Sequence, residues 1–264
     1  SGASSWPALL LVSAGSLVLA TLSTILFEEP LLRNRELKRN ASASISLGLT
    51  GVVVALAVVA VVQALWVKVY SVPSGSMENT LEVGDRMLVN RTAYPDGMAE
   101  SQDVVVFTAN EDWAHPMPPE GAVENAVRTF GDLTGIGRSH EQALVKRVVG
   151  TAGQTVECCT AEGAVTVDGE PLDEPYIHND LPFIRDELDC ESEVISARCF
   201  GPVTVPEDSM LVLGDHRSNS ADSVIACRGI PADQAGDCAR FVTREDIVGE
   251  VFVTVWPPTH WGGH

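Results

Sequence analysis

A turn that contains two serines could supply a nucleophile. The segment Ser74-Gly75-Ser76 follows Pro73, and proline and glycine favour a tight, exposed turn. Such a turn can present a hydroxyl and an adjacent backbone N–H to a single ligand atom. Taken alone, Ser-Gly-Ser is more often an ordinary loop. The catalytic interpretation of Ser76 therefore requires a base that can take the proton from its hydroxyl.

The base that the sequence offers is Lys146. It lies in the apolar run ALVKRVVG, whereas Lys38 and Lys68 lie closer to the N-terminus. Strand alternation would place Leu144 and Val148 on the same face as this lysine. The ordinary alternative is a lysine on an edge strand that points to solvent. Apolar neighbours would disfavour the charged amine and lower its pKa, as a general base requires.

A third segment, GDHRSNSADS at 214–223, is dense in hydrogen-bonding groups and follows the strand-like run SMLVL. Its ordinary interpretation is a polar turn with side chains bonded to nearby backbone. Its position after the serine turn and the lysine run makes it a candidate for supporting them.

These segments resemble the motifs of the type I signal peptidases, which cleave signal peptides from exported preproteins. The motifs stand in the family's order as PSGSMENTLEVGD (73–85), KRVVG (146–150) and GDHRSNSADS (214–223). The run DVVVF (103–107) resembles a further one. The resemblance covers roughly residues 66–255 and leaves two inserts unmatched. The paired cysteines at 158–159 and the long inserts are most similar to actinobacterial members.

The resemblance implies a role for each matched residue. Ser76 would attack the scissile carbonyl, and Lys146 would act first as general base and then as acid. The Ser74 hydroxyl and the Ser76 N–H would form the oxyanion hole, and Ser220 would orient the lysine amine. No metal or cofactor is implied. The implied substrate pockets are small and apolar, lined by Tyr70, Val72, Pro73, Met77, Leu81, Leu144 and Val145.

The third motif also implies support for the lysine, with one departure from the family. Asp215 and Arg147 would pair and hold the loop against the lysine strand. The family has an arginine after its Asp-Ser pair, where this chain has Val224. Asp222 thereby loses its expected partner, and Arg228 is a candidate substitute.

The elements that must position these groups have the pattern of short strands. The runs are Val-rich and bounded by Gly, Pro, Asp and Asn, which is typical of strands. No alternation of strands and helices appears, so the prediction is an antiparallel, mainly β catalytic domain, which the resemblance describes as two coiled, packed sheets. The predicted strands lie at 86–90, 103–107, 144–150, 165–169, 209–215 and 247–256.

Two inserts interrupt this pattern, near 108–140 and 173–201. The first continues as GAVENAVRTFGDLTGIG, where Val123, Val127 and Phe130 could line one helical face. The second is polar and carries cysteines.

Two charge-free stretches predict N-terminal transmembrane helices at 6–27 and 46–67, since about 20 apolar residues span a bilayer. A buried core helix or a signal peptide is the alternative for the first. The loop at 28–45 holds four basic residues, which predicts a cytoplasmic location. Residues 68–264 would then form an extracytoplasmic catalytic domain of a multi-pass plasma-membrane protein.

Charge and cysteine content agree with an acidic domain in an oxidising compartment. The net charge of −19 argues against nucleic-acid binding. All six cysteines lie beyond the second apolar stretch, and disulfides are predicted for Cys190 with Cys199 and for Cys227 with Cys238. Cys158 and Cys159 would form a vicinal bridge or find other partners. Free buried cysteines are the alternative, whereas a zinc site would favour CxxC pairs, which are absent from the sequence.

Two rival functions remain open. A Ser-His-Asp hydrolase could use His216 or His178, although no GxSxG motif surrounds Ser76. A non-enzymatic, membrane-anchored interaction module is the other. The expected partners of the peptidase are preprotein signal peptides and the lipid bilayer, and closeness to the secretion machinery would be compatible with them.

Overall fold

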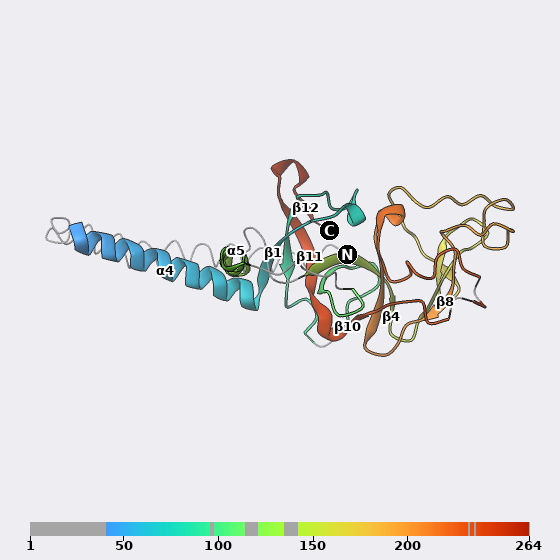
Figure 1. Cartoon of the computed structure of the whole chain (residues 1–264), viewed down its shortest axis with the longest axis horizontal. Helices are drawn as coiled ribbons and strands as arrows, with labels where there is room; N and C mark the ends of the chain where they lie inside the picture. The colour runs from blue at the N-terminus through green and yellow to red at the C-terminus, as the bar shows by residue number, and fades with distance from the viewer. Residues whose placement is uncertain are drawn as a thin grey trace.

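The computed structural model describes residues 41–95, 98–113, 121–134, 142–231, 233–234 and 236–263. The predicted helix at 6–27 and the basic residues of the loop before 40 lie outside these ranges. In the described part, one long helix precedes a domain built mainly from antiparallel strands (Figure 1).

Helix α4 (Ala41–Leu65) projects away from the strands in Figure 1. Its sequence is rich in Ala, Leu and Val and contains no charged residue. The helix ends before the predicted 67, because strand β1 already begins at Val67. Residues 41–45, which were predicted to belong to the loop, are helical instead, as their alanines allow. No helix in the described part of the chain combines the length and apolarity needed to cross a membrane.

The larger sheet is antiparallel throughout and follows the order β1-β2-β11-β3-β4-β9-β10, with β12 paired to β11. Its members are rich in valine, whose branched side chain packs well on a pleated surface. Their bounds are Val67–Ser71 for β1, Arg86–Asn90 for β2, Val104–Thr108 for β3, Ala143–Thr151 for β4, Ser209–Leu213 for β9, Val242–Thr243 for β10, Ile247–Trp256 for β11 and Gly262–Gly263 for β12.

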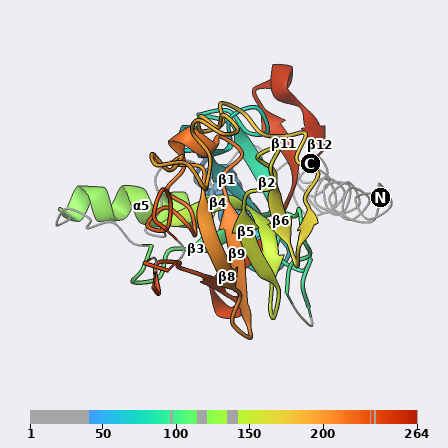
Figure 2. The ribbon, with the colours of Figure 1, turned by 90° about the vertical axis from the view of Figure 1, so that its right-hand side faces the viewer.

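A second sheet of four strands lies at the end remote from α4, as seen from that end in Figure 2. Its order is β7-β6-β5-β8. The chain passes from β4 into this sheet across a short turn, and a Cβ on Gly150 would lie 2.5 Å from Val156 Cγ2. Glycine is therefore required where the two sheets approach. The bounds are Thr155–Cys158 for β5, Val165–Val167 for β6, Glu170–Pro171 for β7 and Phe200–Thr204 for β8.

These two antiparallel sheets confirm the predicted mainly β class. The strands predicted at 86–90 and 247–256 have the predicted bounds, and the others shift by a residue or two. The run predicted at 165–169 ends earlier, at Val167, because Asp168 and Gly169 turn the chain with positive φ angles of 53° and 83°.

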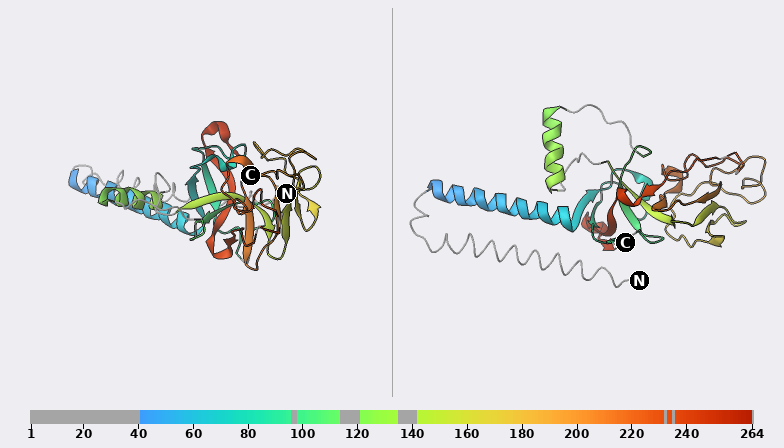
Figure 3. Two further views of the ribbon diagram at one scale, coloured as in Figure 1. Left: turned by 45° about the vertical axis from the view of Figure 1, so that its right-hand side comes forward. Right: turned by 90° about the horizontal axis from the view of Figure 1, so that it is seen from below.

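The first insert contains helix α5 (Ala122–Thr134), which stands apart from the sheets beside α4 (Figure 3). Its apolar residues Val123, Val127 and Phe130 are exposed. The second insert is irregular over most of its length and runs into β8. Four short 3-10 helices complete the described elements: η2 (Gly75–Met77), η3 (Arg217–Asn219), η4 (Arg244–Asp246) and η5 (Pro258–His260).

All six cysteines are paired. Cys190 is bonded to Cys199 and Cys227 to Cys238, as predicted, and Cys158 is bonded to Cys159. The Cys190–Cys199 bond closes the second insert just before β8, and the Cys227–Cys238 bond closes the loop that follows the third motif.

Candidate active site

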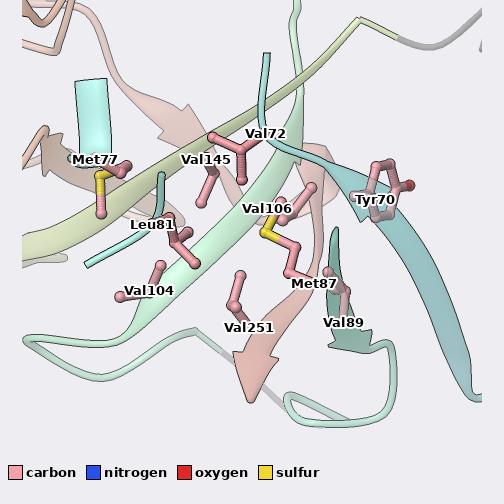
Figure 4. Packing of buried hydrophobic residues seen from close by; sticks show 10 residues of the cluster. All are labelled: Tyr70, Val72, Met77, Leu81, Met87, Val89, Val104, Val106, Val145 and Val251. Atoms are coloured by element: carbon pink, nitrogen blue, oxygen red, sulfur yellow. The ribbon is translucent and has the colours of Figure 1, made fainter. Parts of the chain in front are cut away.

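The turn that carries Ser76 is fixed by the core beneath it. Ser76 lies in η2, and Met77 and Leu81 are fully buried in a cluster under this turn (Figure 4). The Leu81 N–H donates to the Met77 carbonyl at 2.7 Å. The turn therefore stands on a packed base, and Ser76 itself is only 5 % exposed.

Lys146 reaches this serine from the neighbouring strand β4. Its Nζ lies 2.6 Å from Ser76 Oγ and 3.0 Å from the Val145 carbonyl. The side chain is buried, and burial is the main reason why its pKa falls from 10.5 to about 8. Arg240 adds to this decrease, whereas Asp222 and Asp215 oppose it. With this pKa a fraction of the lysine is a neutral amine near pH 7, and this neutral form can take the proton of Ser76.

The third segment closes over the pair at Gly214. A Cβ on Gly214 would meet the Ser220 hydroxyl and would lie 2.5 Å from the Ser76 carbonyl. The same carbonyl accepts a hydrogen bond from the His216 N–H at 3.1 Å. Glycine at 214 thus allows the loop after β9 to pack directly on the Ser76 turn.

Asp215 and Arg147 form the predicted pair. Arg147 donates to both carboxylate oxygens, at 2.9 and 2.6 Å, and Asp215 is fully buried. Thr80 Oγ1 donates to the same carboxylate at 2.5 Å, which ties the Ser76 turn to the loop. The Arg147 guanidinium also lies 3.8 Å above the Tyr176 ring. This network joins β4, the turn, the loop and the second insert.

Asp222 has a partner in spite of Val224. Arg228 Nη2 donates to Asp222 Oδ2 at 3.1 Å, and the Arg240 side chain donates to the Asp222 carbonyl at 3.2 Å. Val224 is fully buried in the core cluster beneath the second sheet. The family's arginine corresponds to position 224, where this chain has valine. Arg228, four residues farther along, pairs with Asp222 instead.

Ser220 does not make the hydrogen bond to the lysine amine that the resemblance implies. Its Oγ is buried and has no hydrogen-bond partner among the described residues. It packs against Gly214 instead, next to the Ser76 carbonyl. The lysine amine is oriented by Ser76 and the Val145 carbonyl. Ser74, the proposed oxyanion donor, is exposed at the start of η2.

Most of the predicted pocket residues belong to one apolar cluster. Leu144 does not join it, because it faces the opposite side of β4 and packs with Val148 in another cluster. Pro73 is exposed. The residues that do gather, labelled in Figure 4, are Tyr70, Val72, Met77, Leu81 and Val145.

His216 does not serve the serine in this structure. Its Nδ1 lies 2.6 Å from Glu78 Oε2 and 3.2 Å from the Gly75 carbonyl, whereas Ser76 Oγ is in contact with Lys146. These contacts favour lysine over histidine as the base.

Sequence reasoning missed the contributions of Thr80, Tyr176 and Arg240. Thr80 lies inside the first quoted motif, so its position could have suggested a role. Tyr176 and Arg240 lie outside the motifs, and they reach the site only through the fold. A further group, Glu78 with His178 and His216, has ligand atoms close enough to hold a metal ion.

A serine hydroxyl held against a buried lysine of low pKa is the arrangement of the serine hydrolases that use lysine as their base. The chain belongs to the signal peptidase family, peptidase S26, and residues 46–256 match the sequence pattern of that family. It is therefore a serine peptidase by family.

Curated relatives agree with this family. A probable signal peptidase I of Mycobacterium leprae is 34% identical over 207 residues, covering 74% of this chain and 70% of that protein. Signal peptidase I of Mycobacterium tuberculosis is 35% identical over 210 residues, covering 73% and 66%. A Leptolyngbya laminosa signal peptidase I is 30% identical over 191 residues, covering 72% and 70%. The mycobacterial matches confirm the resemblance to actinobacterial members.

Proposed function

We propose that this chain removes N-terminal signal peptides from exported preproteins, cutting after small-x-small (Ala-x-Ala-like) sites. Ser76 acts as nucleophile and Lys146 as base. The observation that carries this proposal is the 2.6 Å contact between Lys146 Nζ and Ser76 Oγ in a buried setting. The relatives named signal peptidase I supply the substrate class.

The proposed reaction moves one proton back and forth across this contact. Neutral Lys146 Nζ takes the proton from Ser76 as Oγ attacks the scissile carbonyl. The Ser76 N–H and the Ser74 hydroxyl then stabilise the oxyanion. When the C–N bond breaks, the lysine ammonium gives its proton to the leaving amine. A water molecule, deprotonated by the same lysine, then cleaves the acyl ester and restores Ser76.

Anchoring at a membrane is part of the proposal. The apolar side chains of α4 are exposed along the helix, and the segment carries no charge. The proposed topology is a multi-pass plasma-membrane protein with an extracytoplasmic catalytic domain, where disulfides are stable. Closeness to the secretion machinery remains a prediction. The exposed apolar residues of α4 are Leu49, Val52, Val53, Val54, Leu56, Val59, Val61 and Leu65.

The assay that tests this function is cleavage of a fluorogenic peptide with an Ala-x-Ala site by the full chain in detergent. The purified chain should cleave it at a single bond after the second alanine. Ser76→Ala is the matched control and should show no cleavage above background. Equal cleavage by both proteins, or none by either, would contradict the proposal.

Specificity should follow the size of apolar pockets without a charged base. We expect alanine at the first and third positions before the cut to be preferred over larger side chains. A methylene or two in such a pocket changes the transition-state free energy by about 1–3 kcal/mol, or roughly 10- to 200-fold in kcat/KM. A peptide series with Ala, Val, Phe or Lys at these positions would measure it. Efficient cleavage after Lys or Phe would show that the pocket assignment is wrong.

A further inference from the structure

Three side chains with metal-binding atoms meet beside the catalytic turn. Glu78 follows the Ser76-Met77 pair, His178 belongs to the second insert, and His216 follows Asp215 after β9. One ligand atom from each lies within 4.8 Å of the other two. The mechanism proposed above uses none of these three side chains.

Backbone contacts hold the two histidines in place. The His178 N–H donates to the Asp215 carbonyl at 2.8 Å, and the Ser218 N–H donates to the Asn179 carbonyl at 3.2 Å. The insert is thereby fixed along the loop that carries His216. On the other side, the His216 N–H donates to the Ser76 carbonyl. The backbones of the two histidines are therefore placed by the fold before any ion binds, which lowers the cost of binding.

A simple ion pair accounts for only part of this group. Glu78 Oε2 and His216 Nδ1 lie 2.6 Å apart, which suits a carboxylate–imidazole hydrogen bond. His178 is not needed for that pair, yet its ring stands edge-on to the His216 ring at a centroid distance of 5.1 Å. A ligand shared by the carboxylate and the two imidazoles would account for the place of His178 in this group.

The neighbour of His178 has the form of a ligand-orienting group. The Asn179 side-chain nitrogen Nδ2 lies 2.9 Å from His178 Nε2. The oxygen and nitrogen of an amide are interchangeable at the level of such contacts. With the amide turned over, its oxygen would accept from Nε2–H, and the lone pair of His178 Nδ1 would be available for an ion. Metal-binding histidines generally donate their second N–H to such an acceptor.

We propose that Glu78, His178 and His216 bind a divalent transition-metal ion, with Zn²⁺ as the probe. Two imidazoles and one carboxylate form a donor set suited to zinc and similar ions, and unsuited to calcium or magnesium, which prefer oxygen ligands. Glu78 and His178 are partly exposed and give an ion access from solvent, whereas the His216 side chain keeps only 11 % of its surface exposed. A bound ion would link the Ser76 turn, the loop after β9 and the disulfide-closed insert.

The test is Zn²⁺ binding by the full chain in detergent after removal of metals with a chelator. Competition with a chromophoric chelator should show one site of highest affinity. Glu78→Gln and His178→Ala should each weaken Zn²⁺ affinity at that site by at least about tenfold. Even mutations of residues that only hydrogen-bond to metal ligands lower metal affinity by about 10–100-fold. His260→Ala is the matched control, because His260 pairs with Asp85 elsewhere and offers no ligand to this group.

A second readout separates ligand loss from misfolding. Zn²⁺ should raise the melting temperature of the wild-type chain and of His260→Ala, and it should leave Glu78→Gln and His178→Ala unchanged. If metal-free His178→Ala has a lower melting temperature than the metal-free wild type, the test rests on Glu78→Gln, because glutamine has the same shape as glutamate. Equal zinc affinity in the wild type, Glu78→Gln and His178→Ala would overturn the proposal. The proposal would also be overturned if His260→Ala lost as much Zn²⁺ affinity as Glu78→Gln.

Discussion

Lys146→Met should reduce kcat/KM by at least about 10³-fold, because removing one partner of a nucleophile–base pair leaves an unactivated serine. Methionine has a similar length and fits the apolar surroundings of the lysine, so the protein should still fold. The measurement is cleavage of the Ala-x-Ala peptide by the wild type and the variant at one pH. Lys146→Arg should fail as well, because a guanidinium stays protonated.

The same variant should be more stable than the wild type near neutral pH. Burial lowers the pKa of Lys146 from 10.5 to about 8, so below pH 8 the folded chain carries an unfavourable buried charge. A shift of this size corresponds to at most roughly 3 kcal/mol of unfolding free energy. Between about pH 8 and 10.5 the unfolded chain binds the extra proton, so wild-type stability rises with pH in this window. The advantage of Lys146→Met should shrink accordingly.

His216→Ala is the control for this mechanism. The His216 side chain contacts Glu78 and the Gly75 carbonyl rather than the Ser76 hydroxyl. Its loss should therefore reduce kcat/KM far less than Lys146→Met. If His216→Ala abolishes cleavage while Lys146→Met remains active, the lysine mechanism is wrong and a histidine mechanism should replace it.

Asp215→Ala should have the second large effect, on stability and activity together. The carboxylate accepts two hydrogen bonds from Arg147 and one from Thr80 in a buried setting. Removing it leaves a nearly buried guanidinium without its partner, which costs about 3–5 kcal/mol. Because the pair joins the Ser76 turn to the loop after β9, the catalytic contact should loosen as well. Urea unfolding and peptide cleavage would measure the two losses.

Asp180→Ala is a matched control for the buried pair. Asp180 and Arg198 also form an Asp–Arg pair, at 2.9 Å, but both side chains keep about a fifth of their surface exposed. Breaking this pair should cost less than breaking the fully buried one, because both of its side chains keep contact with solvent, and it should leave cleavage intact. If Asp215→Ala costs no more than Asp180→Ala, the Arg147–Asp215 pair does not hold the site together.

The sequence was informative where a local pattern decides the structure. Valine-rich runs predicted the strands, and the lysine within one of them lies buried on β4 as its apolar neighbours suggested. The cysteine pairs at 190 and 199 and at 227 and 238 were predictable because each pair closes a short polar loop. The early end of α4 at Leu65 was not, because the apolar run continues without a break through Trp66 to Val67, the first residue of β1.

The parts that could not be predicted depend on contacts between distant segments. Arg228 pairs with Asp222 only because the disulfide-closed loop folds back on the third motif. Ser220 packs against Gly214 instead of reaching the lysine, which the motif alone cannot distinguish. The approach of His178 to Glu78 depends on the path of an insert that has no regular pattern.

The central claim is that Lys146, as a neutral amine, is the base for Ser76. The most direct measurement is the pH dependence of kcat/KM for the full chain with an Ala-x-Ala peptide. The account predicts a rise of about tenfold per pH unit on the acid side that levels off near the Lys146 pKa of about 8, unchanged in His216→Ala. A rise centred near 6.5, the ordinary pKa of histidine, that disappears in His216→Ala would contradict it.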